Sequence, residues 1–359
     1  MFENLAARVK SFFGTGQENV AGNNGSTRQY VYVCNQGSNS ISQYRISATG
    51  SLEPLAAASV AAGTTPVFIA VSPSGKNVYV ANQGGNNISQ YRINADGNLE
   101  VFAQPVAAGT APVAIAIDPS GKYAYAANNS SNEISQYQID EHGKLHAMTP
   151  ASAITGVVPV AIAVHPSGKY VYVVNNSSQN IYQYTVAGNG HLLSMNPASV
   201  ETGASPRAIA LAPSGRYAYV VNRTAGNISQ YKVGMIGELS PVFNPVAAGK
   251  HPIAIAITPC GNYAYVANQN GNSISQYSVS ENGGLLPLTP ATVECLVTPV
   301  SIAPDSSARY LYVCNISSND VAQYLIGKQG QLEAIPMNKW GDATVAADTS
   351  PRSIAVTGK

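Results

Sequence analysis

Charge is scarce in this sequence. Asp, Glu, Lys and Arg make up 10% of the 359 residues, against roughly 25% in an average globular protein. The formal net charge is +1, so the chain lacks the basic surface that nucleic-acid binding requires, and we expect no nucleic-acid partner. No apolar run approaches the roughly 20 residues of a membrane-spanning helix, so no transmembrane segment is expected either.

Motifs for the common enzyme chemistries are also missing from the sequence. It contains no Gly-x-Ser-x-Gly elbow, no phosphate-binding loop and no His, Cys, Asp or Glu residues at metal-ligand spacing. We therefore predict no cofactor and no metal site. Which residues would be catalytic stays unknown at this point, and the sequence leaves open whether the protein is an enzyme.

What the sequence has in abundance is repetition. An Asn recurs at a spacing of 46 or 47 residues, and a Gln-Tyr pair follows eight residues after each copy. The Asn copies are Asn35, Asn82, Asn128, Asn175, Asn222, Asn268 and Asn315. A period this regular indicates one supersecondary unit repeated seven times, because a single unit cannot bury its own apolar face.

Each period divides into four short strands, which we call A to D. In the second copy they are expected at 66–72, 77–81, 88–93 and 99–106, separated by turns rich in Gly, Pro, Asn and Ser. Four strands in about 45 residues are the unit of a β-propeller blade. We therefore predict an all-β, seven-bladed propeller with four antiparallel strands per blade, a closed arrangement without long open sheet edges.

The ends of the repeat predict how the ring closes. The first copy begins at strand B, at Tyr30, and the chain ends with an unpaired strand A at 350–356. The C-terminal strand should therefore complete the first blade as its innermost strand. We predict two parts of the chain, an N-terminal extension of residues 1–29 and a propeller of residues 30–359.

The extension has apolar residues at helical spacing. Residues 2–13 predict a short amphipathic helix that could serve as a docking or interfacial segment, although a loosely held terminus followed by a flexible linker is the simpler interpretation. The segment does not resemble a secretory signal, because it lacks a sustained apolar core and a small-residue cleavage site. As printed, the chain would suit the cytoplasm, yet its low charge and abundant Asn and Ser would also suit an exported protein, so the compartment stays unknown.

The four cysteines, Cys34, Cys260, Cys295 and Cys314, are predicted to be free thiols. Cys34 and Cys314 occupy the same repeat position in neighbouring blades, where adjacent sheets should lie about 10 Å apart, too far for a disulfide. Cys260 and Cys295 belong to loops on opposite faces of the ring.

The repeated Gln and Asn residues are predicted to be structural. The Gln lies on strand C between blades and should form hydrogen bonds across the interface, since a buried amide without partners costs about 1–3 kcal/mol. The Asn ends strand B, where an Asx-type turn suits it.

Candidate functional residues lie where the repeat is broken. The residue after the strand A proline is aliphatic in five blades but is Arg207 in the fifth and Arg352 in the first. Lys250 and His251 precede the strand A proline of blade six. We expect these four residues to gather at the mouth of the channel on its top face, the face of the D–A and B–C loops. The planar guanidinium group of an arginine can donate two parallel hydrogen bonds to the oxygens of an anion such as a carboxylate.

A second break is an insertion in the last full repeat. The interval from the turn leucine to the next strand A proline is 13 or 14 residues in six blades and 19 from Leu332 to Pro351. The insertion surrounds Trp340, the only Trp of the chain, with Lys339 and Asp342 beside it. Trp340 could anchor a ligand or a protein partner, or it could simply cover the end of a blade.

The Pro-Ser-Gly-Lys-Tyr-Val-Tyr-Val-x-Asn run, the Gly-x-Leu turn and the seven copies resemble the lactonase-like β-propellers, a family that includes 6-phosphogluconolactonases and YVTN-repeat propellers. The resemblance covers residues 30–357. It implies Gly-Pro-Arg-His at some strand A starts, with Arg and His at the channel mouth. Here Ser205-Pro-Arg207 and Ser350-Pro-Arg352 supply the Arg, but Ala208 and Ser353 stand in place of His.

Two functions follow as hypotheses. The first is a binding module that takes a small anionic or sugar-acid ligand, or a protein partner, at the top face without catalysis. The alternative is a lactone hydrolase of the 6-phosphogluconolactonase type whose catalytic residues have been displaced. A His or Glu within reach of Arg207 or Arg352 would favour the second hypothesis.

Overall fold

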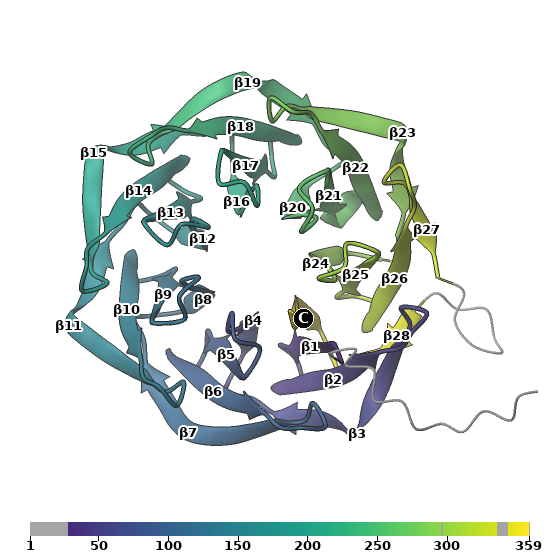
Figure 1. Cartoon of the computed structure of the whole chain (residues 1–359), viewed down its shortest axis with the longest axis horizontal. Helices are drawn as coiled ribbons and strands as arrows, with labels where there is room; N and C mark the ends of the chain where they lie inside the picture. The colour runs from purple at the N-terminus through teal and green to yellow at the C-terminus, as the bar shows by residue number, and fades with distance from the viewer. Residues whose placement is uncertain (1–27, 296, 336–343, 359) are drawn as a thin grey trace, which may run out of the picture.

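The protein is a seven-bladed β-propeller (Figure 1). The computed structural model describes residues 28–295, 297–335 and 344–358. The predicted helix at 2–13 and the predicted site residue Trp340, with Lys339 and Asp342, lie outside these residues. In the described part of the chain no helix has the length and apolar character needed to cross a membrane.

Each blade is an antiparallel sheet whose strands run from the channel outward in the order A, B, C, D (Figure 1). Blade 1 contains β29 (Pro351–Val356), β1 (Tyr30–Asn35), β2 (Ser40–Ile46) and β3 (Leu52–Ala61). Blade 2 contains β4 (Pro66–Val71), β5 (Asn77–Asn82), β6 (Asn87–Ile93) and β7 (Leu99–Ala107). Blade 3 contains β8 (Pro112–Ile117), β9 (Tyr123–Asn128), β10 (Glu133–Ile139) and β11 (Leu145–Ile154).

The remaining four blades follow the same order around the ring. Blade 4 contains β12 (Pro159–Val164), β13 (Tyr170–Asn175), β14 (Asn180–Val186) and β15 (Leu192–Glu201). Blade 5 contains β16 (Pro206–Leu211), β17 (Tyr217–Asn222), β18 (Asn227–Val233) and β19 (Leu239–Ala247). Blade 6 contains β20 (Pro252–Ile257), β21 (Tyr263–Asn268), the 3-10 turn η1 (Gln269–Gly271), β22 (Ser273–Val279) and β23 (Leu285–Glu294). Blade 7 contains β24 (Pro299–Pro304), β25 (Tyr310–Asn315), β26 (Asp320–Ile326), β27 (Leu332–Ala334) and β28 (Thr344–Ala346).

The insertion in blade 7 divides its outer strand. β27 pairs with the C-terminal part of β26, and β28 pairs with the N-terminal part of the same strand. The prediction of four strands per blade therefore holds for six blades, whereas the fourth strand of blade 7 is built from two segments.

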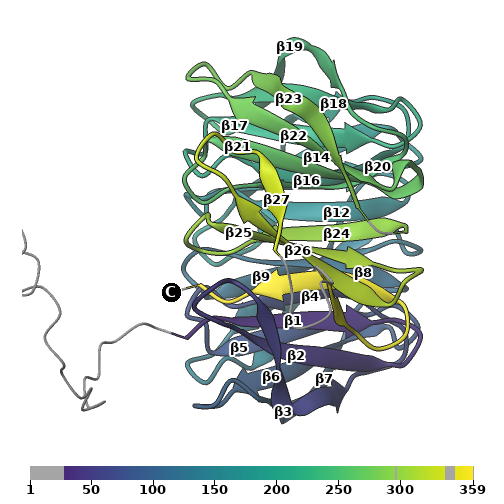
Figure 2. The same cartoon turned by 90° about the vertical axis from the view of Figure 1, so that its right-hand side faces the viewer.

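The ring closes as predicted. β29 pairs with β1, so the C-terminal strand is the innermost strand of blade 1 (Figures 1 and 2). The Tyr30 N–H donates to Thr357 Oγ1 at 2.9 Å, and Ile354 is buried in the interface between blades 1 and 7. Closure therefore depends on a strand from each end of the chain.

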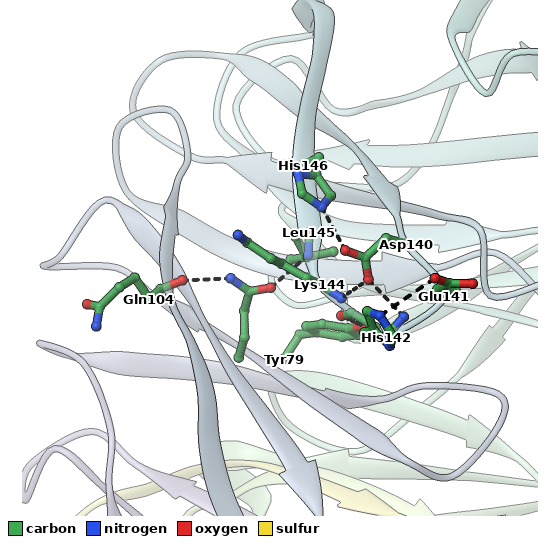
Figure 3. Close-up of polar contacts among 10 residues, drawn as sticks. Tyr79, Gln104, Asp140, Glu141, His142, Lys144, Leu145 and His146 are labelled. Atoms are coloured by element: carbon green, nitrogen blue, oxygen red, sulfur yellow. Dashed lines mark hydrogen bonds and ion pairs between the residues drawn. The ribbon is translucent and has the colours of Figure 1, made fainter.

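The blades are joined by repeated hydrogen bonds, as the Gln pattern predicted. Each strand C glutamine accepts, through Oε1, the N–H of the leucine that begins strand D of the next blade, at 2.5–2.9 Å in all seven copies. In blades 1 to 6 the Nε2 group of this glutamine also donates to a strand D carbonyl of its own blade, as Gln90 does to Gln104 (Figure 3). These six glutamines thus satisfy backbone groups of two blades at once.

Tyrosines form two further rings of contacts between blades. Seven strand B tyrosines donate to the carbonyl of the C–D turn glycine in the next blade at 2.6–2.8 Å, as Tyr79 does to Gly143 (Figure 3). Seven strand C tyrosines donate to a carbonyl at the end of strand D, or of β28, in the preceding blade at 2.6–3.2 Å. Burial raises the pKa of the Tyr137 phenol to about 12, so these hydroxyls remain donors at neutral pH.

The repeated Asn makes a different contact from the expected Asx-type turn. Asn82, which is fully buried, donates through Nδ2 to Asn87 Oδ1 at 2.7 Å and to Ser89 Oγ at 2.8 Å. The amide therefore spans the B–C hairpin instead of capping its own turn, because the polar side chains that begin strand C lie within its reach.

All four cysteines are free thiols, as predicted. Cys34 and Cys314 are fully buried in neighbouring blades, and burial raises the pKa of the Cys34 thiol to about 12. Cys260 is exposed on an A–B turn. Cys295 is partly buried and donates to Asn315 Oδ1 at 3.1 Å.

We predict that deleting residues 350–359 lowers the melting temperature by about 10 °C or more. The deletion removes the ladder between β29 and β1 and the buried Ile354 side chain, whose loss alone costs about 2–5 kcal/mol. Thermal unfolding followed by circular dichroism measures the effect. Deleting only residues 358–359 leaves the strand intact and is the control. An unchanged melting temperature in the longer deletion would show that β29 does not close the ring.

We predict that Gln183→Ala destabilises the protein. The substitution leaves the Leu239 N–H and the Pro197 carbonyl without their hydrogen-bond partner in a buried interface. The expected cost is about 1–3 kcal/mol for each unsatisfied group. The control is Gln138→Ala, on the exposed part of a neighbouring strand C, which should change stability by less than about 0.5 kcal/mol. Urea unfolding compares the two variants, and equal midpoints would contradict the structural role of the glutamine ring.

We predict that the thiols react in a fixed order. In the native protein Cys260 reacts quickly with a thiol reagent, whereas Cys34 and Cys314 react only after unfolding, because burial disfavours the thiolate. Denatured protein that has not been reduced should titrate four thiols. A smaller number in that experiment would reveal a disulfide and contradict the geometry of the blades.

Candidate functional site

The mouth of the channel is formed by a β-bulge at the start of every strand A. The residue after the proline has no partner in strand B and is the extra residue of the bulge. These residues are Val67, Val113, Val160, Arg207, Ile253, Val300 and Arg352. A bulge redirects a side chain out of the regular alternation, and all seven of these side chains line one cavity at the channel.

The cavity has a volume of about 260 Å³. At about 30 Å³ per water molecule, it has room for roughly nine waters or a small organic molecule. Blades 2 to 4 supply an apolar wall with Phe68 among its residues, and Phe68 packs against the cores on both sides of blade 3. Gln83 and Asn129, from the B–C loops, add two polar side chains to the lining.

Arg207 and Arg352 supply the positive charge of the cavity. They come from β16 and β29, on opposite sides of the channel, and both side chains are partly buried. Burial lowers the pKa of Arg207, and the nearby charges of Arg352 and Arg223 lower it further. A guanidinium nevertheless stays protonated at neutral pH.

Neither arginine has a counter-ion or a hydrogen-bond acceptor within the described ranges. The described lining residues include no Asp, Glu or His. Two half-buried cations that face each other across a small cavity repel unless an anion lies between them. The electrostatics of the mouth therefore favour an anionic ligand.

The structure separates the other predicted site residues from this pair. Lys250 is exposed and His251 is partly buried, and neither lines the cavity. His251 has a φ of 55°, and its Nδ1 is buried without a partner among the described residues. The cavity is thus lined by the first and, in most blades, the second residue after the strand A proline, and the residues before the proline are not part of its lining.

Sequence reasoning missed Arg223, which stands next to Arg207. It directly follows the repeated Asn222, and its Nη2 donates to Gln269 Oε1 at 3.3 Å. The same position in the other blades holds Gln36, Gln83, Asn129, Asn176, Gln269 and Ile316. The sequence did contain a signal for Arg223, because this position is charged in blade 5 and neutral in the other six blades.

Ala208 and Ser353 occupy the positions where the resemblance implied a histidine. Both line the cavity beside their arginines. Ser353 Oγ accepts the Ile69 N–H at 3.3 Å, and Ser301 in blade 7 accepts the Ile354 N–H in the same way. These serines join the inner strands of adjacent blades, and each hydroxyl keeps its hydrogen available to a ligand.

Comparisons with known proteins agree with this architecture. A Bacteroides fragilis protein described as a "putative 6-phosphogluconolactonase" superposes with a TM-score of 0.80 at 18% identity, covering 94% of this chain and all of that one. The periplasmic gluconolactonase PpgL of Pseudomonas aeruginosa gives a TM-score of 0.77 at 19% identity over 92% of this chain and 99% of its own. At such identities the likeness shows the fold alone. No curated relative matches the chain.

The family model for "Lactonase, 7-bladed beta-propeller" matches residues 24–113, 99–205 and 181–347 in overlapping segments that span most of the chain. The matched segments include Arg207 and the repeated Gln and Asn residues, whereas Arg352 lies beyond the last of them. The chain belongs to the lactonase family of seven-bladed β-propellers.

Proposed function

We propose that the protein hydrolyses a lactone at the channel mouth, with Arg207 and Arg352 holding the oxygens of the substrate. The observation that carries the proposal is the arginine pair, which is partly buried in a small cavity and has no partner within the described residues. Membership of the lactonase family and the names of the similar structures point to the lactone as the substrate class.

Lactone hydrolysis needs hydrogen-bond donors that stabilise the developing oxyanion more than it needs a side chain that bonds covalently to the substrate. Water adds to the lactone carbonyl, the bond between the carbonyl carbon and the ring oxygen breaks, and the ring oxygen leaves as a hydroxyl after taking a proton. The product hydroxy acid then ionises and releases one proton. Guanidinium donors that face the carbonyl oxygen favour its developing negative charge, and the same donors would hold the product carboxylate.

The size and wall of the cavity limit the substrate. About 260 Å³ admits a single small ring with short substituents. Five of the seven bulge residues are aliphatic, so the polar groups of the substrate should be concentrated toward Arg207, Arg352 and Ser353. We infer that the substrate or its product is a small anion, of which a sugar acid is one candidate.

A second candidate is a module that binds such an anion without catalysis. It is favoured by the lining itself, because the described wall offers neither imidazole nor carboxylate as a general base, and Ala208 and Ser353 replace the histidine of related lactonases. A protein partner at the top face also stays a prediction. The two candidates differ in one measurable property, which is turnover.

We predict that Arg207→Ala with Arg352→Ala abolishes lactone hydrolysis and weakens product binding at least about a hundredfold. Each charge-assisted hydrogen bond contributes roughly 1.5–3 kcal/mol, and 1.4 kcal/mol corresponds to a tenfold change. Proton release in a pH-stat measures turnover of glucono-lactones and simple alkyl lactones. Calorimetry with the matching hydroxy acids measures binding.

The matched control is Arg216→Ala with Arg309→Ala. It removes the same charge from two exposed A–B turns that do not line the mouth cavity. This variant should retain parental activity and binding. Binding with no turnover in the parent would select the binding module, and a mouth variant that binds and hydrolyses like the parent would place the site elsewhere.

A further inference from the structure

A further break in the seven-fold pattern lies on the opposite face of the ring. In six blades strand B begins with a tyrosine whose ring packs on the C–D turn glycine of the next blade. These tyrosines are Tyr30, Tyr123, Tyr170, Tyr217, Tyr263 and Tyr310. A Cβ atom on any of the facing glycines would come within 2.0–2.4 Å of a ring carbon, so ring and glycine fit closely.

Blade 2 has Asn77 at this position. Its amide packs on Gly143 as the tyrosine rings pack on their glycines, and a Cβ atom on Gly143 would lie 2.4 Å from Asn77 Oδ1. The outer atoms of a tyrosine ring are missing here. A cavity of about 900 Å³ opens between blades 2 and 3 at this place, lined by residues that include Lys76, Asn77, Lys122 and Tyr123. Asp140, Glu141 and Gly143 of the C–D turn line its other side.

Asn77 presents a polar group to the cavity. Its exposed fraction is 7%, and its side-chain amide has no hydrogen-bond partner among the described residues, although it lines the cavity. The amide atoms are not among the buried polar atoms that lack a partner, so they are accessible from the cavity. The amide therefore offers one donor and one acceptor to a group that enters the cavity.

The cavity lining carries two carboxylates, Asp140 and Glu141, and two lysines, Lys76 and Lys122, so its formal charges balance. Asp140 is engaged within its own turn, because Oδ1 accepts the N–H groups of His142 and Lys144 and Oδ2 lies 2.8 Å from His146 Nε2 (Figure 3). The bond to His146 is the main cause that lowers the pKa of Asp140. Glu141 lies 3.6 Å from His142. Lys76 and Lys122 have no ion pair among the described residues, so their ammonium groups are available to an anionic group that enters the cavity.

We propose that this cavity binds an aromatic ring that carries an anionic substituent, the class of the aryl carboxylates. The ring occupies the space that the outer atoms of a tyrosine fill in the other six blades, beside Tyr123. The carboxylate lies toward Lys76 and Lys122, and a polar substituent bonds the Asn77 amide. This site is separate from the channel mouth and does not depend on the proposed hydrolysis.

The test is a titration with 4-hydroxybenzoate, followed by saturation-transfer NMR and calorimetry. It is run in the Arg207→Ala, Arg352→Ala background, so that the mouth cannot contribute an anion site. Saturable binding is expected, and cyclohexanecarboxylate, which has the same charge but no flat ring, should bind at least tenfold more weakly. Adding Asn77→Tyr should abolish the binding without lowering the melting temperature, because six blades already accommodate this tyrosine.

Tyr217→Asn is the matched control for Asn77→Tyr. It changes the equivalent position of blade 5 and leaves Asn77 in place, so the affinity of the original site should not change. Absence of saturable binding in the background protein would overturn the proposal. Binding that survives Asn77→Tyr, or that does not distinguish the aromatic acid from the cyclohexane acid, would overturn it as well.

Discussion

The structure depends on one requirement, which is that polar groups buried between blades find partners in the neighbouring blade. Seven sheets packed face to face would otherwise leave the start of each strand D and each C–D turn with unsatisfied backbone groups. The strand C glutamine accepts a hydrogen bond from the N–H that begins strand D, and the strand B tyrosine donates one to the carbonyl of the C–D turn glycine. A buried group left unpaired would cost about 1–3 kcal/mol, and every blade has the same need. The regular repeat in the sequence is therefore a consequence of this requirement, and the side chains that meet it leave little freedom for function.

The residues that we propose to be functional consequently lie where the repeat does not determine the residue. The bulge at the start of strand A is the clearest example, because its extra residue has no partner in strand B and points into the channel. Five aliphatic residues and two arginines are equally compatible with the bulge, so the composition of the mouth can change without altering the blades. The start of strand B in blade 2 shows the same freedom on the opposite face, where Asn77 replaces a tyrosine.

The sequence was sufficient to predict the ring, its closure and the glutamine contacts, because each follows from a period of about 46 residues and from the position where the period begins. It also predicted that Arg207 and Arg352 lie at the mouth, and both line the cavity there. It did not separate them from Lys250 and His251, since the direction of a side chain at a bulge depends on one inserted residue. Arg223 and Asn77 were missed for a different reason, because each is conspicuous only when all seven copies are compared at that position.

Under the proposed function, the arginine pair holds an anion at the mouth of the channel. A crystal structure of the protein with a bound hydroxy acid tests this claim. We expect the carboxylate to lie between Arg207 and Arg352, with guanidinium nitrogens about 2.7–2.9 Å from its oxygens. A hydroxy acid that binds the protein in the same crystals but touches neither arginine would contradict the claim.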